Sequence, residues 1–161
     1  MAVEAPFSRH NITNYKIYIA GCLLAAVIFA YDGYLSKYKW SRRYDFYKKH
    51  VLDNDGKPSS TMVFNQKSPP VFLGAAILLW VYLSLIRKKK IIAGENELLL
   101  GTKKRINYDA IRKIDKTNFD SKGFFIITYK NHHDREIDLK ISDRKYDNLT
   151  PLLELLVAKI S

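Results

Sequence analysis

Two long apolar runs without charged residues constrain this chain more than any other feature. The first extends from Ile17 to Tyr31 and the second from Ser68 to Ile86, in a chain of 161 residues. A helix rises about 1.5 Å per residue and the hydrocarbon core of a bilayer is about 30 Å thick, so roughly 20 residues suffice to cross it. The sequence therefore predicts two transmembrane helices, at residues 16–35 and 68–86, which would leave both chain termini on the same side of the membrane.

Each predicted helix has an alternative interpretation. A weakly basic segment before a short apolar run is also typical of a signal peptide, although the first run ends in tyrosines rather than in an Ala-x-Ala cleavage pattern. The second run could be a buried helix of a soluble protein, but apolar residues around a whole helix are rare outside lipid. We expect Pro69 and Pro70 in the first turn of this helix, where proline is tolerated.

Aromatic residues flank the first run and continue beyond it, which is typical of side chains at a membrane–water interface. Residues 36–67 predict an amphipathic helix, a turn at 53–56 and a surface loop at 57–67. The stripe of this helix is Trp40, Tyr44, Tyr47 and Val51. The stripe either rests on lipid or a partner, or packs within the protein on an extension of the first helix. The predicted interfacial anchors are Tyr15, Tyr18, Tyr31, Tyr34, Trp40, Tyr44 and Tyr47.

Residues 87–161 have a different pattern of apolar and polar residues from the rest of the chain. Short runs of β-branched and aromatic residues at 91–92, 97–100, 105–108, 110–116, 124–130 and 135–141 alternate with polar turns. No crossover helix separates them, so an antiparallel meander is expected. From residue 146 to residue 160 the period becomes helical, with Pro151 in the first turn. The apolar stripe of this helix is Leu149, Leu152, Leu153, Leu156 and Ile160.

This stretch resembles the bacterial pleckstrin-homology-like (PH-like) domains found beside transmembrane hairpins. The matching features are GENELLLGTKKRINYDAIRKID, GFFIITYK, REIDLKI and the terminal LLELLVAKI helix. The resemblance implies a small bent antiparallel β-sheet capped by the C-terminal α-helix, and therefore an α+β membrane protein. In that family the domain contacts lipid headgroups or proteins. The expected organisation is an N-terminal segment (1–15), transmembrane helix 1 (16–35), an amphipathic helix with a connecting loop (36–67), transmembrane helix 2 (68–86) and the PH-like domain (87–161).

The distribution of Lys and Arg bears on orientation and partners. Nine lie on the side of the termini, counted up to Arg105, and eight between the helices, so the count alone does not decide the orientation. We favour cytoplasmic termini in a bacterial cytoplasmic membrane, because a basic block directly abuts the second helix. The net charge of +11 is typical of a chain with an anionic partner such as phospholipid or nucleic acid, but it also serves solubility and membrane topology, so the sign alone does not choose among these. The candidate lipid-headgroup contacts are Arg87, Lys88, Lys89, Lys90, Lys103, Lys104 and Arg105.

Nucleic-acid binding and catalysis are not expected. Residues 87–161 hold 17 basic and 11 acidic residues, a small excess, and lack the glycine-and-aromatic pattern of RNA-binding sheets. Cys22 is the only cysteine, which excludes a disulfide framework and cysteine-rich metal sites. His132 and His133 lie in a polar turn, and Asp32 ends the first apolar run at an expected interfacial position. We therefore expect no catalytic residue, no cofactor, no metal and no small-molecule substrate.

The sequence favours a non-enzymatic, membrane-anchored interaction module. Such a module would contact membrane lipids and other subunits of a larger membrane complex, as an accessory or assembly subunit. The alternative is an anionic-lipid sensor that uses the basic residues beside the second helix. A small membrane enzyme or transporter component is least favoured, because two helices with at most one ionisable residue cannot enclose a polar pathway alone.

Overall fold

The structure is a computed structural model that describes residues 2–101, 104–131 and 133–160. The chain forms two compact units. One unit, here called the helical hairpin, is Asn14–Tyr82. The other, here called the module, combines the residues up to Thr13 with those from Leu83 onward.

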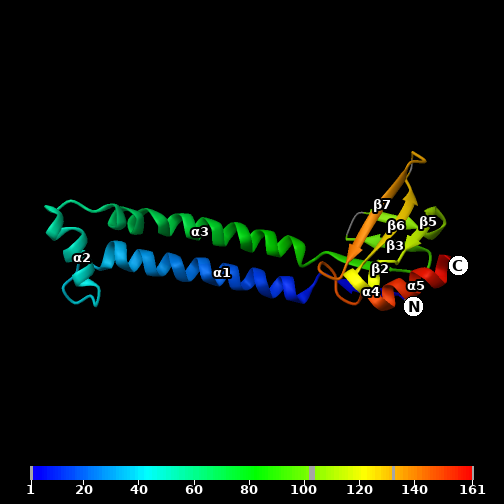
Figure 1. Cartoon of the computed structure of the whole chain (residues 1–161), viewed down its shortest axis with the longest axis horizontal. Helices are drawn as coiled ribbons and strands as arrows, with labels where there is room; N and C mark the ends of the chain where they lie inside the picture. Colours follow the sequence, from blue (N-terminus) through cyan, green and yellow to red (C-terminus); the bar gives the residue numbers. More distant parts are fainter. Residues whose placement is uncertain (1, 102–103, 132, 161) are drawn as a thin grey trace. The chain divides into compact units, whose positions relative to one another are not determined.

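Two long antiparallel helices build the hairpin, α1 (Arg9–Ala30) and α3 (Ser60–Ile86) (Figure 1). Their direction follows from aromatic contacts, because Tyr15 meets Tyr82 while Phe29 stacks on Phe72, with ring centroids 5.3 and 5.4 Å apart. A π-helical turn, η1 (Tyr31–Leu35), prolongs α1.

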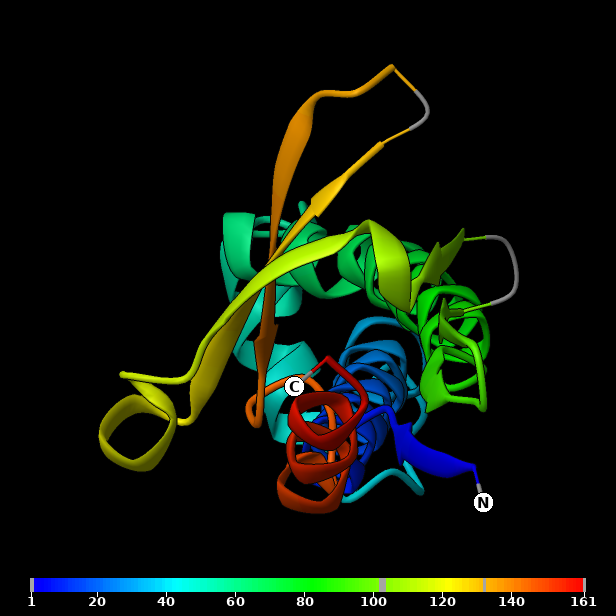
Figure 2. The same cartoon turned by 90° about the vertical axis from the view of Figure 1, so that its right-hand side faces the viewer.

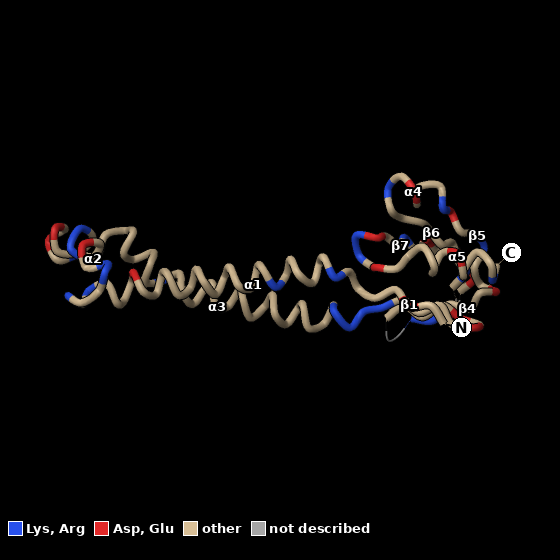
Figure 3. Tube along the Cα trace, turned by 90° about the horizontal axis from the view of Figure 1, so that it is seen from below, with Lys and Arg blue, Asp and Glu red and all other residues tan. Residues whose placement is uncertain are grey.

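The two helical stretches, Arg9–Leu35 and Ser60–Ile86, are long and apolar enough to cross a membrane. They end at the predicted residues 35 and 86, but both begin earlier than the predicted residues 16 and 68. Charged residues are sparse along their middle portions (Figure 3). Most of their large apolar side chains are exposed, with Leu24 and Leu78 at 62% and 73%. This exposure argues against the alternative of a core helix in a soluble protein, because such a helix would be buried.

The segment between the two long helices contains α2 (Tyr44–His50) and a short turn, η2 (Leu52–Asn54). Trp40 lies before α2, so the prediction of a helical stripe that begins at Trp40 is wrong. The predicted turn at 53–56 is confirmed, because Asp55 and Gly56 adopt left-handed conformations with φ of 53° and 73°.

The predicted surface loop at 57–67 is also wrong, since α3 already begins at Ser60. The Ser59 hydroxyl accepts a hydrogen bond from the backbone N–H of Met62 at 3.4 Å, in the manner of a helix N-cap. Met62 is fully buried. Capping and burial thus start the helix earlier than its apolar run, and Pro69 and Pro70 lie inside α3 rather than in its first turn.

Among the described residues, the module has seven strands in two antiparallel sheets. The first sheet has the order β1-β2-β3-β4 and the second the order β5-β6-β7. The first sheet consists of β1 (Val3–Pro6), β2 (Lys90–Ala93), β3 (Glu97–Leu100) and β4 (Lys104–Asn107). The second consists of β5 (Ile111–Asp115), β6 (Phe124–Lys130) and β7 (Glu136–Ser142). Figure 2 shows the β6–β7 hairpin of the second sheet beside the C-terminal helix.

The six strands expected from residue 91 onward are confirmed within two residues at each end. The first strand, β1, was expected only as part of an N-terminal segment. It pairs with β2, with Val3 opposite Ala93 and Pro6 opposite Lys90. The chain therefore leaves the first sheet after β1, forms the hairpin, and returns to the same sheet as the neighbouring strand β2.

One helix closes the core of the module, α5 (Leu149–Ile160), with Pro151 in its first turn as predicted. Its predicted stripe is buried apart from the half-buried Ile160. The short η3 (Tyr108–Ala110) and α4 (Phe119–Lys122) connect strands. Along β7 only Ile141 is fully buried, because β6 and β7 form a hairpin that projects beyond the core (Figure 2). The broad α+β class is confirmed, with two sheets observed instead of a single bent sheet.

Candidate functional site

A hollow of about 690 Å³ lies in the module beside the C-terminal end of α3. It combines two of the predicted basic segments, because Lys88 and Lys89 line it together with Lys104 from the start of β4. The remaining lining is mainly apolar and comes from α3, the β3–β4 connection, β7 and the segment before α5: Leu85, Leu100, Gly101, Leu139 and Tyr146.

The electrostatics of the hollow favour an anion. Lys88, Lys89 and Lys104 are exposed, and no carboxylate lies among the lining residues. The ammonium of Lys104 lies 4.9 Å from the centroid of the Tyr129 ring, which fixes this lysine by a cation–π contact. Burial raises the pKa of the Tyr146 phenol, so its hydroxyl stays protonated and can donate a hydrogen bond to an anion.

The other predicted basic residues do not line this hollow. Lys90 is half-buried and forms an ion pair with Glu4 at 2.9 Å, which joins β2 to β1. Arg105 pairs with Glu97 at 3.2 Å, and Arg87 is exposed. Lys103 lies outside the described residues. The structure thus brings together three of the seven predicted headgroup contacts.

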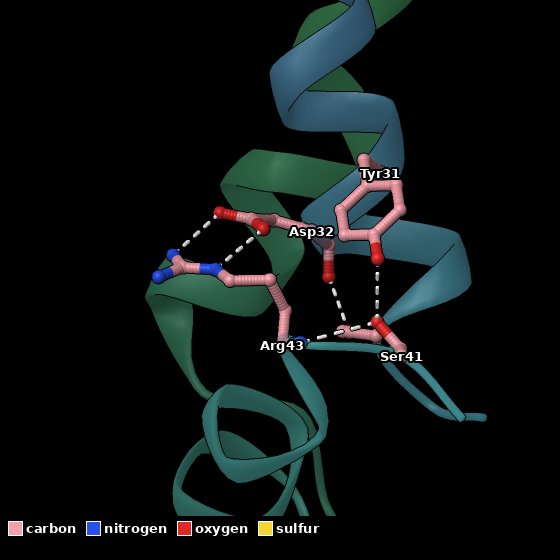
Figure 4. Close-up of polar contacts among 5 residues, drawn as sticks. Tyr31, Asp32, Ser41 and Arg43 are labelled. Carbon is pink, nitrogen blue, oxygen red and sulfur yellow. Dashed lines mark hydrogen bonds and ion pairs between the residues drawn. The ribbon is translucent and has the colours of Figure 1, made fainter. Parts of the chain in front are cut away.

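A second polar cluster lies in the hairpin, where α1 ends (Figure 4). The Arg43 guanidinium donates to both carboxylate oxygens of Asp32, at 2.9 and 2.8 Å. Asp32 is 8% exposed, and hydrogen bonding to its carboxylate raises the pKa of Arg43. The Ser41 hydroxyl donates to the Tyr31 hydroxyl at 3.1 Å. This cluster ties the connecting segment to the end of α1, and places Asp32 in an ion pair rather than in a pathway across the hairpin.

The π-helical turn at the end of α1 contacts α3 next to its two prolines. Proline has no N–H, so Pro69 and Pro70 leave the carbonyls of Asn65 and Gln66 without their usual helical donors. The Tyr34 hydroxyl donates to the Gln66 carbonyl at 2.6 Å. Gly33 lies against the Asn65 carbonyl, and the Gln66 side chain donates back to the Gly33 carbonyl at 3.2 Å. The π-helical turn thus supplies a hydrogen bond to the Gln66 carbonyl in place of the one that Pro70 removes.

The predicted aromatic anchors fall into two groups. Tyr15 and Tyr18 lie in the first turns of α1 and contact each other, and Tyr82 completes this group. The others surround the end of α1 and the connecting segment. Of these, Tyr34 and Trp40 are 50% and 70% exposed, while Tyr31, Tyr44 and Tyr47 are half-buried.

Sequence reasoning missed the apolar lining of the hollow and two aromatic residues, Tyr38 and Tyr82. Leu100 and Leu139 were recognised only as strand residues, since nothing local indicates that β3 and β7 meet beside the end of α3. Tyr38 and Tyr82 both carry a local signal, because Tyr38 lies between the predicted anchors Tyr34 and Trp40 and Tyr82 lies near the end of the second apolar run.

The described part of the chain contains no group of three His, Cys, Asp or Glu side chains that could hold a metal ion. His133 is exposed in the turn between β6 and β7, and His132 lies outside the described residues. No family model, curated protein or solved structure matches the chain.

Proposed function

We propose that this chain is a non-enzymatic, membrane-anchored PH-like interaction module that serves as an accessory or assembly subunit of a larger membrane complex. One observation carries the proposal: the hairpin of membrane-length helices is inserted between two neighbouring strands, β1 and β2. The module is therefore attached to the membrane anchor at two points. Both ends of the hairpin lead into the same sheet of the module.

The strand arrangement supports the PH-like assignment. A bent antiparallel sheet capped by a C-terminal helix is what the resemblance implies, and the module has four plus three antiparallel strands followed by α5. The pairing of β1 also argues against a cleaved signal peptide, because cleavage after the first helix would remove a strand of the core. Two spans place both termini on one side, and we propose the cytoplasmic side of a bacterial membrane.

Membrane extraction followed by cross-linking tests this function. We expect the full-length chain to stay in the membrane fraction after alkaline carbonate washing and to cross-link to a neighbouring protein in intact membranes. After extraction in mild detergent it should migrate as a complex larger than the chain alone. A chain that is recovered in the aqueous fraction without detergent, or that migrates alone without a cross-linked neighbour, would contradict the proposal.

The hollow in the module favours a second candidate function, the binding of an anionic phospholipid. Three lysines can pair with a phosphate, while Leu85 and Leu139 offer apolar contacts to the glycerol and upper acyl region. The hollow lies beside the C-terminal end of α3, where the chain would leave the membrane. A lipid in this site would be a bound ligand rather than part of the surrounding bilayer.

Replacing the lysines of the hollow should weaken this binding selectively. Each basic residue near a membrane surface contributes about 1 kcal/mol, so the triple variant K88Q/K89Q/K104Q should lose on the order of a hundredfold in apparent affinity. Native mass spectrometry of the full chain in neutral detergent, titrated with phosphatidylglycerol, measures this affinity. The variant K113Q/K122Q/K159Q removes the same charge from exposed positions outside the hollow and should bind like the unmodified chain. Equal losses in the two variants would show that only net charge matters.

A further inference from the structure

The segment that joins α1 to α3, residues 36–59, carries an exposed aromatic surface. We call this segment the cap. Trp40 is 70% exposed and stacks on Tyr38, with ring centroids 5.6 Å apart and ring planes inclined by 12°. Tyr38 and Leu52 are themselves 43% and 48% exposed. Large apolar side chains gathered on one exposed surface typically mark a contact with a membrane or a protein.

Basic side chains accompany these aromatic rings. The cap contains seven Lys and Arg and three Asp, which gives a net charge of 7 − 3 = +4. The ammonium of Lys37 lies 5.2 Å from the centroid of the Tyr38 ring, and Lys39, Lys48 and Lys49 are exposed. Trp and Tyr prefer the headgroup level of a bilayer, and Lys and Arg pair with anionic lipid phosphates. The composition of this surface is therefore complementary to an anionic headgroup layer.

The cap is tied to the end of the hairpin. The ion pair between Arg43 and Asp32 joins it to the η1 turn, and the hydrogen bond from Ser41 to Tyr31 adds a second link. Ser41 and Val51 are buried, so the cap packs against neighbouring residues at these two positions. Its distance from the bilayer is consequently set by the two long helices.

We propose that the cap docks on the anionic headgroup layer of the leaflet in which the hairpin turns. Trp40 and Tyr38 lie at headgroup level, and the surrounding Lys and Arg side chains pair with lipid phosphates. The proposal rests on the membrane-spanning role proposed above for α1 and α3. The net positive charge, together with the position at the end of two membrane-length helices, favours lipid over a protein as the occupant.

Tryptophan fluorescence tests the docking, because the chain has only two tryptophans. The variant W80F leaves Trp40 in the cap, and W40F leaves Trp80 in α3. Each full-length variant is placed in nanodiscs of phosphatidylcholine alone or of phosphatidylcholine with phosphatidylglycerol, and is quenched with iodide from water or with brominated lipids. We expect Trp40 to be several-fold less accessible to iodide in the anionic nanodiscs than in neutral detergent. We also expect lipids brominated near the headgroup to quench it.

Charge variants in the W80F background test whether the cap contacts anionic lipid through its lysines or only lies near the bilayer. K37Q/K39Q and K48Q/K49Q should lose most of the difference in Trp40 protection between the two nanodisc compositions. The control K113Q/K122Q removes equal charge from the module and should keep that difference.

The docking proposal would be overturned if Trp40 were fully accessible to iodide in anionic nanodiscs while Trp80 was protected. That result would leave the membrane anchor intact. Protection of Trp40 only after a protein partner is added would identify a protein surface instead. If Trp80 is also unprotected in nanodiscs, the membrane-spanning role itself fails.

Discussion

Residues 88–161 expressed alone should fail to form the stable module, because they lack β1. Phe7, which follows β1, is 7% exposed, and burial of such a side chain contributes about 1.5–3 kcal/mol. Each hydrogen bond between β1 and β2 adds about 1 kcal/mol. We therefore expect a loss of about 3–6 kcal/mol, which is comparable to the whole stability of many small domains.

Joining residues 2–8 to residue 88 through a short turn should restore the fold without the hairpin. The backbone N–H of Phe7 donates to the Lys89 carbonyl at 3.1 Å, so the two ends to be joined are already neighbours. Urea denaturation followed by far-UV circular dichroism compares the fragment with the joined protein. Within the joined protein, A5D should be strongly destabilising because Ala5 is fully buried, whereas E4Q at an exposed position should cost less than about 1 kcal/mol. A fragment as stable as the joined protein would contradict the role of β1.

Local patterns predicted most of the module correctly. The final helix has a clear period of three to four residues, and its buried face is the one that the pattern indicates. The strand at 124–130 is predicted from its β-branched and aromatic residues, and Phe125, Ile127 and Tyr129 form its buried face. The predicted turn at 53–56 depends on Asp and Gly residues whose preference for left-handed backbone is also local. The lysines of the hollow could be named from the sequence because they flank an apolar run and a strand turn.

The features that sequence reasoning missed all depend on contacts between distant residues. β1 has four residues and ends in Pro6, so it has no recognisable alternation, and its partner Lys90 lies at the other end of a long insertion. The predicted position of Pro69 in the first helical turn is wrong because α3 begins after the capping residue Ser59 and not at the start of the apolar run. The hollow is lined by residues of β3, β7 and α3, and no local sequence pattern indicates that these three elements lie side by side.

Gly33→Ala should destabilise the hairpin, although alanine is usually the better helix residue. A Cβ atom at Gly33 would lie 2.7 Å from the Asn65 carbonyl oxygen and 2.8 Å from its carbon. Both atoms belong to the backbone, so α1 and α3 would have to separate rather than a side chain rotate. Overpacking of this kind costs about 1–3 kcal/mol. Separation would also weaken the hydrogen bond from Tyr34 to the Gln66 carbonyl, which has lost its helical donor to Pro70.

The matched control is Gly21→Ala, within α1, where an added Cβ meets nothing within 4 Å. Its stability in neutral detergent, measured by unfolding with increasing sodium dodecyl sulfate, should equal or exceed that of the unmodified chain. A second variant, Tyr34→Phe, removes only the hydroxyl and should cost about 1 kcal/mol or more, since it leaves the Gln66 carbonyl without this donor. If Gly33→Ala proved as harmless as Gly21→Ala, the close approach of α1 to the proline turn of α3 would be wrong. We expect Gly33→Ala and Tyr34→Phe to lower stability and Gly21→Ala to leave it unchanged. This result would show that the π-helical turn allows α3, with its two internal prolines, to pack against its neighbour.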